Sequence, residues 1–558
     1  MTSTFDPVFV ALGGAGEIGM NLYAYGYGPE RDRRWIVVDV GVTFPEEGKH
    51  PGVDLIFADV AFLEKQADRI DGIFITHAHE DHVGALPRLA ERLGTAPIYA
   101  RAFTSEIARL KLSESDTSEG RVKTVGAWPE TVQAGSFSVG FFPISHSIPE
   151  SSMLVIDTPA GRILHTGDWK ADPTPLVGEP FDPEGIKTLS KDGVLALVCD
   201  STNIFSGNPG RSEADIVTPI EELMRNEPGM IVATTFASNI ARLRTLAQAA
   251  TKAERSVVVI GRAMHRMIST ARKVGLLTDF PDILDARDAE GIPAEHLFVL
   301  ASGSQGEGRA ASAQLARGGY GRLSLKDGDV FLFSSKTIPG NEVAVADIQN
   351  LLAQQGVRVV DDAGGLYHVS GHANRPDLLA MHKLVNPRGL VPMHGEYRHL
   401  AEHARAAEQH GIASVVAPNG TLVALTADGP QLVEHIDTGR LYLDGTQVYG
   451  AMDGIVRERL RMSWRGHVVV NLVFDERDAL MGDAWVETRG LFTDLDGEEG
   501  ALQAKLEQVV TDALGSAKRG QRSDDAQVEK LVLGRINTTC QQLLGKKPEI
   551  TVMINRID

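Results

Sequence analysis

Short apolar runs recur along most of the chain, and several of them lead to a histidine or an aspartate. Runs of this kind between polar or glycine residues predict buried β-strands. The predicted strands and the side chains they lead to are 35–38 and Asp39, 73–76 and His77, 137–144 and His146, 162–166 and Asp168, and 194–198 and Asp200. Helically spaced apolar residues between 86 and 93 predict a helix that ends near Gly94. Strand followed by helix indicates an α/β layer, where sites assemble at the carboxyl ends of strands.

Two further α/β regions follow this layer. Strands are predicted at 231–235, 256–260, 297–300, 329–333 and 357–360, with helical stretches between them. Such alternation favours a mainly parallel sheet covered on both faces, so we expect a second domain. After Gly445 the chain is charged and is expected to be irregular through 457–459. A small α/β tail is then predicted, with strands at 468–473, 485–491 and 550–554 and helices at 500–514 and 526–544.

A glycine-rich stretch at 13–19 follows the first predicted strand and satisfies G-x-G-x-x-G, with Asp39 about twenty residues further on, as in dinucleotide-binding folds. Those folds need a helix after the glycines. Residues 21–25 instead alternate in polarity like a strand, and two glycines and a proline at 26–29 then interrupt the chain. We therefore expect a β-hairpin, and NAD binding is the alternative.

Four potential metal ligands follow the apolar run 73–75: His77, His79, Asp81 and His82. On an extended backbone, residues two apart project to the same side, so His77 and His79 can hold one ion together. Asp81 and His82 lie on the following turn and point elsewhere, which favours two neighbouring metal sites. Imidazole and carboxylate ligands suit zinc or a similar first-row ion. The alternative is a solvated histidine-rich loop.

Histidine chemistry returns at 368–374 and at His394, which again follows a short apolar run. If the first domain resumes here, the second domain is an insertion, and His394 can complete a metal site begun by Asp81 and His82. His372 lies in a loop of small residues and suits a group that donates a proton or a hydrogen bond to a bound phosphate. Turn or surface roles are expected for four other histidines: His382, His399, His403 and His410.

Composition limits the classes of protein. A chain of 558 residues with 43% hydrophobic and 23% charged residues is typical of a multidomain globular protein. Its two distant cysteines, Cys199 and Cys540, favour a reducing compartment. No apolar run has membrane-spanning length and the first seven residues do not resemble a signal peptide, so we expect a cytoplasmic protein without a membrane partner.

The net charge also bears on the partner. A formal charge of −19 argues against nonspecific binding of nucleic acid over the whole surface, because a polyanion is repelled at long range. Two divalent ions add about four positive charges, of which two carboxylate ligands cancel about half. The predicted metal site would therefore attract phosphate.

Taken together, Asp39, His77-x-His79-x-Asp81-His82, His146 and Asp168 resemble the metallo-β-lactamase superfamily. The insertion after Asp200, followed by His372 and His394, resembles the β-CASP branch, which acts on nucleic acids. The stretches 11–19, 338–342, 368–373 and 392–396 resemble the bacterial ribonuclease J family more closely. The resemblance implies an α/β fold: a metallo-β-lactamase αββα sandwich with an inserted β-CASP α/β domain and a small C-terminal α/β domain.

The implied domain limits follow from where the motifs fall. Residues 1–205 would form the first part of the metallo-β-lactamase domain and 206–365 the inserted β-CASP domain. Residues 366–445 would complete the first domain, and 446–558 would form a linker and the C-terminal domain.

The resemblance implies a zinc-dependent 5′-to-3′ exonuclease and endonuclease acting in messenger RNA decay and ribosomal RNA maturation. One zinc ion would be bound by His77, His79 and His146, and the other by Asp81, His82 and His394, with Asp168 between them. Manganese is the alternative metal. Asp39 and Asp200 would orient ligands from behind, and Asp81 and His372 are the expected catalytic residues.

The family also implies where RNA and a further cation bind. The expected RNA contacts are Ala237, Ser238 and Asn239 in one loop and His368, Val369, Ser370, Gly371, His372, Ala373 and Asn374 in another. A structural calcium ion would lie near Asp444 and the main-chain carbonyls of Pro51 and Val53. The substrate would be single-stranded RNA with a 5′-monophosphate. A homodimer or homotetramer and an RNA-degradation complex are the implied assemblies.

At two positions the sequence differs from the usual family pattern, and two other functions are alternatives to the one that the resemblance implies. Ala78 stands where the family usually has glycine, and Lys336 lies in a serine-rich loop where it can strengthen a phosphate contact. The first alternative is a hydrolase of the same core acting on a small ester or thioester. The second is a non-catalytic RNA-binding subunit. A metal assay that finds no metal bound to the protein would support this alternative.

Overall fold

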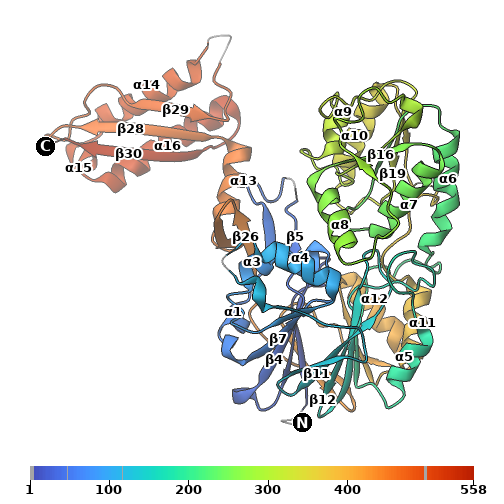
Figure 1. Cartoon of the computed structure of the whole chain (residues 1–558). Helices are drawn as coiled ribbons and strands as arrows, with labels where there is room; N and C mark the ends of the chain where they lie inside the picture. Colours follow the sequence, from blue (N-terminus) through green and yellow to red (C-terminus); the bar gives the residue numbers. More distant parts are fainter. Residues whose placement is uncertain (1–5, 47, 116, 363, 495–498, 558) are drawn as a thin grey trace. The chain divides into compact units, whose positions relative to one another are not determined.

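The computed structural model describes residues 6–46, 48–115, 117–362, 364–494 and 499–557. It divides into two compact units, one formed by Met1–Phe44 with Leu55–Leu441 and the other by Pro45–Asp54 with Tyr442–Asp558. Figure 1 shows the elements of both units. Within the described ranges, no helix combines the length and the apolar character needed to cross a membrane.

Two β-sheets facing each other form the lower body of the first unit (Figure 1). The eight-stranded sheet has the order β25 (Gly429–His435), β24 (Thr421–Thr426), β1 (Val8–Gly13), β3 (Leu22–Tyr27), β4 (Arg34–Val38), β7 (Ile70–Phe74), β8 (Ile98–Ala100) and β9 (Val122–Thr124). The seven-stranded sheet has the order β10 (Thr131–Ala134), β11 (Phe137–Pro143), β12 (Ser152–Thr158), β13 (Gly161–His165), β14 (Ala196–Asp200), β21 (Gly389–Met393) and β23 (Ala413–Ser414).

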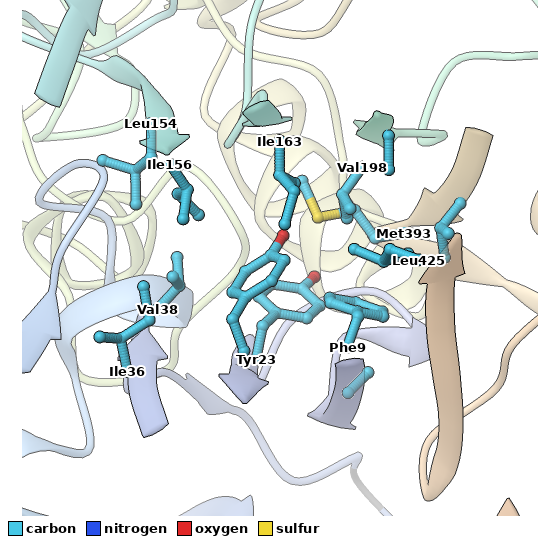
Figure 2. Packing of buried hydrophobic residues seen from close by; sticks show 14 of the residues in the cluster. Phe9, Tyr23, Ile36, Val38, Leu154, Ile156, Ile163, Val198, Met393 and Leu425 are labelled. Atoms are coloured by element: carbon cyan, nitrogen blue, oxygen red, sulfur yellow. The ribbon is translucent and has the colours of Figure 1, made fainter. Parts of the chain in front are cut away.

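The core of this sandwich lies between the sheets. Figure 2 shows Phe9 and Tyr23 from the first sheet opposite Ile163 and Val198 from the second. All four are at most 1% exposed and belong to one cluster of buried side chains. Helices α5 (Pro183–Ser190), α11 (Arg375–Val385) and α12 (Tyr397–Glu408) share a second core with the outer face of the seven-stranded sheet, and α4 (Ala102–Leu112) contacts β8 and β9 of the eight-stranded sheet. The expected αββα sandwich is therefore confirmed.

The glycine-rich stretch begins a β-hairpin. Strand β1 pairs antiparallel with β3, with Val10 opposite Ala24, and no helix follows the glycines. The predicted hairpin is confirmed, and the dinucleotide-fold alternative is wrong. The short elements nearby are β2 (Ala15–Gly16), β5 (Val42–Thr43), β6 (Leu55–Ala58), α1 (Ala61–Glu64), α2 (Glu80–Val83), α3 (Leu86–Leu89) and β22 (Gly395–Glu396). Helix α3 is shorter than predicted, although Ala90 and Leu93 are buried as their spacing requires.

The inserted region is the predicted second α/β layer. Its six-stranded sheet has the order β17 (Ile283–Leu284), β16 (Ser256–Ile260), β18 (Leu297–Ala301), β15 (Ile231–Thr234), β19 (Val330–Phe333) and β20 (Arg358–Val360). Every pairing is parallel. The helices of this region are α6 (Val217–Asn226), α7 (Ile240–Lys252), α8 (Arg262–Lys273), α9 (Ala311–Ala316) and α10 (Glu342–Gln354). The chain then returns to the sandwich, where β21 pairs parallel with β14.

The second unit contains the predicted α/β tail. Strands β29 (Trp485–Arg489), β28 (His467–Phe474) and β30 (Glu549–Arg556) form a sheet whose core is shared with α14 (Ala501–Ser516) and α16 (Asp525–Leu544). The other elements in this part of the sequence are β26 (Arg440–Asp444), which belongs to the second unit from Tyr442 onward, β27 (Gln447–Gly450), α13 (Ile455–Arg465) and α15 (Arg519–Arg522). Helix α13 corrects the expected irregular stretch at 457–459. Its charged residues have high helix propensity, and Gly454 and Gly466 flank the helix.

Candidate metal centre and RNA site

Three histidines and a carboxylate converge where strands of both sheets end. Nε2 of His77, which follows β7, lies 3.0 Å from Nδ1 of His79. The same Nδ1 is 3.1 Å from Nε2 of His146, which follows β11. Oδ2 of Asp168 is 3.8 Å from Nε2 of His77 and 3.9 Å from that of His146. Burial holds the pKa of His77 and His146 well below the ordinary value and lowers that of His79 to about 4, so the rings are neutral and can ligate a metal.

A second group shares the same carboxylate oxygen. Nε2 of His82 and of His394 lie 3.2 and 3.0 Å from Oδ2 of Asp168. They lie 3.5 and 3.6 Å from Oδ2 of Asp81. Burial disfavours charge on both rings, but the nearby carboxylates, Asp168 foremost, raise both pKa values. The carboxylates thus favour positive charge here, which a metal cation also supplies.

The donor atoms fit two divalent ions. Within each group, one atom per residue can be chosen so that all lie within 4.8 Å of one another. Tetrahedral zinc, with ligands at about 2.0–2.3 Å, would separate its donor atoms by roughly 3.3–3.7 Å. Oδ1 of Asp168 is buried and has no hydrogen-bond partner among the described residues. The structure therefore brings together all seven predicted ligands, and their ligand roles stay a prediction.

Asp39 lies fully buried behind His82. Its Oδ2 accepts a hydrogen bond from Nδ1 of His82 at 2.7 Å. The carboxylate also accepts from the N–H and the hydroxyl of Thr76, at 2.8 and 2.9 Å. These bonds select the orientation in which Nε2 of His82 faces Asp168. Burial raises the pKa of Asp39, and His82 opposes that rise.

Asp200 holds His372 rather than a metal ligand. Its Oδ2 accepts a hydrogen bond from Nδ1 of His372 at 2.8 Å. Burial alone would lower the pKa of His372, but Asp200 and neighbouring carboxylates raise it to about 9, so the ring is protonated at neutral pH. Its ring centre lies 5.2 Å from that of His146 and 5.5 Å from that of His394. A cationic imidazole here is placed to meet a phosphate oxygen.

The predicted RNA-contact loops lie in two places. The loop after β15 runs into α7, where Asn239 is buried and accepts a hydrogen bond from the N–H of Arg242 at 3.0 Å. Ser238 is half-buried. In the loop at 368–374, Val369 and Ala373 are at most 4% exposed, which leaves mainly their main chain for a ligand.

Sequence analysis did not single out two residues of this site. Asn203 Nδ2 lies 2.8 Å from Oγ of Ser370 and 3.1 Å from the carbonyl oxygen of His372. Asn21 Nδ2 lies 3.1 Å from the carbonyl oxygen of Asp81. Both amides hold loops that carry predicted site residues. Their positions after a strand and inside a hairpin are the only hints that the sequence offers.

Three of the four histidines expected in turns or at the surface are buried. His382, His399 and His403 are 2%, 7% and 0% exposed, whereas His410 is exposed as expected. Nε2 of His382 lies 3.0 Å from Nε2 of His403, and Nδ1 of His403 lies 2.9 Å from Oγ of Ser201. The expectation was wrong because His382 and His403 lie on the inner faces of α11 and α12.

The predicted calcium position already has a positive charge beside it. Nη1 of Arg459 donates to the carbonyl of Pro51 at 3.2 Å, and Nη2 pairs with the carboxylate of Asp444. Val53, the third predicted member, is 7% exposed. Because the guanidinium of Arg459 already contacts two of the three predicted calcium ligands, these residues are a poor fit for a calcium ion.

Comparison with protein families accounts for most of the chain. Residues 26–197 match the metallo-beta-lactamase superfamily, and 228–352 match the beta-CASP domain of ribonuclease J. Residues 365–418 match the Zn-dependent metallo-hydrolase RNA specificity domain, and 454–557 match the ribonuclease J C-terminal domain.

Whole-chain comparison decides the family. The chain is 41% identical to ribonuclease J of Sinorhizobium meliloti over 559 aligned residues, which cover 100% of this chain and 98% of the relative. The chain belongs to the ribonuclease J family. Ribonuclease J of Mycolicibacterium smegmatis is 36% identical over 90% of both chains, and ribonuclease J 1 of Streptococcus pyogenes is 32% identical over 98% of this chain and 96% of the relative. As a member of the ribonuclease J family, the chain is a metal-dependent ribonuclease.

A solved structure with the same fold comes from Enterococcus faecalis V583, where it is described as a protein of unknown function. It superposes with a TM-score of 0.52 at 16% identity and covers 75% of this chain and 100% of that one. This likeness concerns the fold alone.

Proposed function

We propose that this chain hydrolyses RNA phosphodiester bonds with two zinc ions, both as a 5′-to-3′ exonuclease that prefers a 5′-monophosphate end and as an endonuclease. Messenger RNA decay and ribosomal RNA maturation are its proposed processes. The observation that carries the proposal is the convergence of two ligand groups on Asp168, with a third group of Asp168, Asp200 and His372 beside them. Two relatives that align with 100% and 90% of this chain are named ribonuclease J, which supports RNA as the substrate.

The proposed ligand groups are His77, His79 and His146 for one ion, and Asp81, His82 and His394 for the other, with Asp168 shared. When bound, two divalent ions lower the pKa of a water molecule and neutralise charge on the phosphate. Asp39 keeps His82 directed toward Asp168 through the 2.7 Å hydrogen bond. In this proposal Asp81 accepts a proton from the attacking water, and its side chain, 30% exposed against 2% for Asp168, is the more accessible of the two carboxylates.

His372 acts on the phosphate in this proposal. Asp200 occupies its Nδ1, so Nε2 remains to donate a hydrogen bond or a proton to a phosphate or leaving oxygen. The segment 370–374 offers a hydroxyl, small residues and main-chain groups close to this ring, which suit a 5′-monophosphate. Its shape is maintained by Asn203, which reaches Ser370 and Asn374 at 2.8 and 3.0 Å.

Digestion of one end-labelled single-stranded RNA tests the proposal. The RNA carries either a 5′-monophosphate or a 5′-hydroxyl, and each form is digested with and without a chelator. We expect faster release of 5′ nucleotides from the monophosphate form, loss of all cleavage with the chelator, and recovery with zinc or manganese. His77→Ala should cleave on the order of a hundredfold more slowly or not at all. Full activity of that variant without metal, or equal digestion of both ends, would contradict the proposal.

The chain's assembly is proposed separately. A homodimer or homotetramer is expected, and it is measured by light scattering of the purified chain across a range of concentrations. A mass of one chain at every concentration would exclude it.

A further inference from the structure

Four buried charged side chains connect the sandwich to the inserted region: Lys170, Asp172, Glu213 and Arg242, each at most 4% exposed. Nζ of Lys170 lies 2.8 Å from Oδ2 of Asp172 and 3.9 Å from Oε2 of Glu213. Glu213 accepts two parallel hydrogen bonds from Arg242, at 2.6 Å from Nε and 3.0 Å from Nη2. Two positive and two negative groups balance, as charges buried away from water require.

One end of this network lies in the backbone of the metal centre. Lys170 is two residues after Asp168, and its N–H donates to the carbonyl of Ser145 at 2.8 Å, directly before His146. The carboxylate of Asp172 accepts the N–H of Glu213 at 2.9 Å. The network therefore fixes the chain where it enters the inserted region. It is connected to the two backbone segments that carry the proposed metal ligands His146 and Asp168.

The other end holds both predicted RNA-contact loops. Arg242 lies in the first turn of α7, three residues after Asn239. Its Nη1 donates to the carbonyl of Ser334, directly after β19, at 2.8 Å and to the carbonyl of Tyr367 at 3.1 Å. Tyr367 immediately precedes the loop at 368–374. One guanidinium thus fixes the start of α7, the end of β19 and the segment by which the chain returns to the sandwich.

We propose that Lys170, Asp172, Glu213 and Arg242 form a positioning network that sets the RNA-contact loops at a fixed distance from the metal centre. The inference rests on the ribonuclease function proposed above. A shift of the inserted region would separate paired charges in a low-dielectric interior, which is strongly unfavourable. Among the described residues, none of the four side chains hydrogen-bonds or ion-pairs with a proposed metal ligand. The network therefore controls how RNA is held, while the metal centre performs the reaction.

Steady-state kinetics on a 5′-monophosphorylated oligoribonucleotide test this role. Glu213→Gln keeps the size of the side chain and removes its charge, whereas Glu213→Asp keeps the charge. Arg242→Lys keeps a positive charge but loses the two-pronged contact. The matched control is Glu221→Gln, which removes a carboxylate from a pair with Lys252 at 2.6 Å that lies entirely within the inserted region. Bound metal and melting temperature are measured for each variant.

For Glu213→Gln and Arg242→Lys we expect KM to rise by about tenfold or more while kcat changes by less than about threefold. Glu213→Asp should recover part of the affinity, bound metal should be unchanged, and Glu221→Gln should match the wild type. Wild-type kinetics in Glu213→Gln would overturn the inference. An equal fall of kcat in all variants, or loss of metal or folding in all of them, would assign the residues a purely structural role and overturn it too. Failure of the wild type to cleave RNA would instead overturn the proposed function itself.

Discussion

His146 donates its Nδ1 proton to the main-chain carbonyl of Gly371, 2.6 Å away, across 225 positions of sequence. The bond turns Nε2 of His146 toward His79 and Asp168. It also joins the loop that carries His372 to a proposed metal ligand. A substitution in the loop should therefore disturb the metal centre.

Gly371→Ala tests this link. An added Cβ would lie 2.8 Å from Cε1 of His146 and from Oγ of Ser147, closer than real Cβ contacts. Because disturbed support of a metal ligand typically costs ten- to a hundredfold in affinity or activity, we expect a loss of about tenfold in kcat/KM and weaker metal binding. Gly207→Ala is the control, since an added Cβ there meets nothing within 4 Å. Equal activity of the two variants would show that the loop yields without moving His146.

Asp39→Asn tests the support behind the second ligand group. The amide cannot provide the carboxylate's charge to Nδ1 of His82, which lies 2.7 Å away. We expect metal affinity, measured by competition with a chelator, to fall about ten- to a hundredfold. Asp157→Asn is the control, because Asp157 lies in the same domain and pairs with Arg162 at 2.7 Å. If Asp39→Asn bound metal as tightly as the wild type, Asp39 would have no supporting role in the metal centre.

The positions of the proposed ligands could be predicted because each follows a local pattern. An apolar run ending in a histidine or aspartate marks both a strand and the edge where it stops, as for His77 and Asp168. The long-range contacts that shape the site have no local sequence pattern of this kind. Asn203 lies 167 positions from Ser370, and a neutral amide after a strand looks the same whether or not it meets a distant loop.

The errors have related causes. Charge alone suggested an irregular stretch around Arg459, although arginine and glutamate have high helix propensity and the segment forms α13. Histidine polarity suggested that His382 and His403 lie at the surface. Their burial depends on which helix face meets the sheet, and the Nε2 atoms of the two rings lie 3.0 Å apart there.

This buried pair predicts a loss of stability in acid. Burial lowers the pKa of His382 to about 4, below the unfolded value of about 6.5, so between these values the unfolded chain binds more protons. The contribution of the neutral His382 ring to the free energy of unfolding is fully present above the unfolded-state pKa and falls as the pH approaches 4. Between pH 7 and pH 5 the expected loss is about 2 kcal/mol. Urea unfolding of the wild type and His382→Gln at both pH values measures it.

His382→Gln should therefore lose less stability on acidification than the wild type. His435→Gln, at an exposed position of β25, should behave like the wild type. The same pH dependence in all three chains would show that His382 accepts a proton without cost in the folded state.

Arg459 predicts how the second unit responds to calcium. Its guanidinium donates to the carbonyl of Pro51 at 3.2 Å and pairs with Asp444, so the wild type should melt at the same temperature with or without millimolar calcium. Arg459→Gln removes the positive charge and frees both oxygen groups. Calcium should then stabilise the variant by about 1 kcal/mol at several times its dissociation constant. The control is Arg461→Gln, which removes a guanidinium 3.5 Å from Glu549 and leaves Asp444 paired. If calcium stabilised the wild type as much as Arg459→Gln, calcium would bind at a different place from the guanidinium of Arg459.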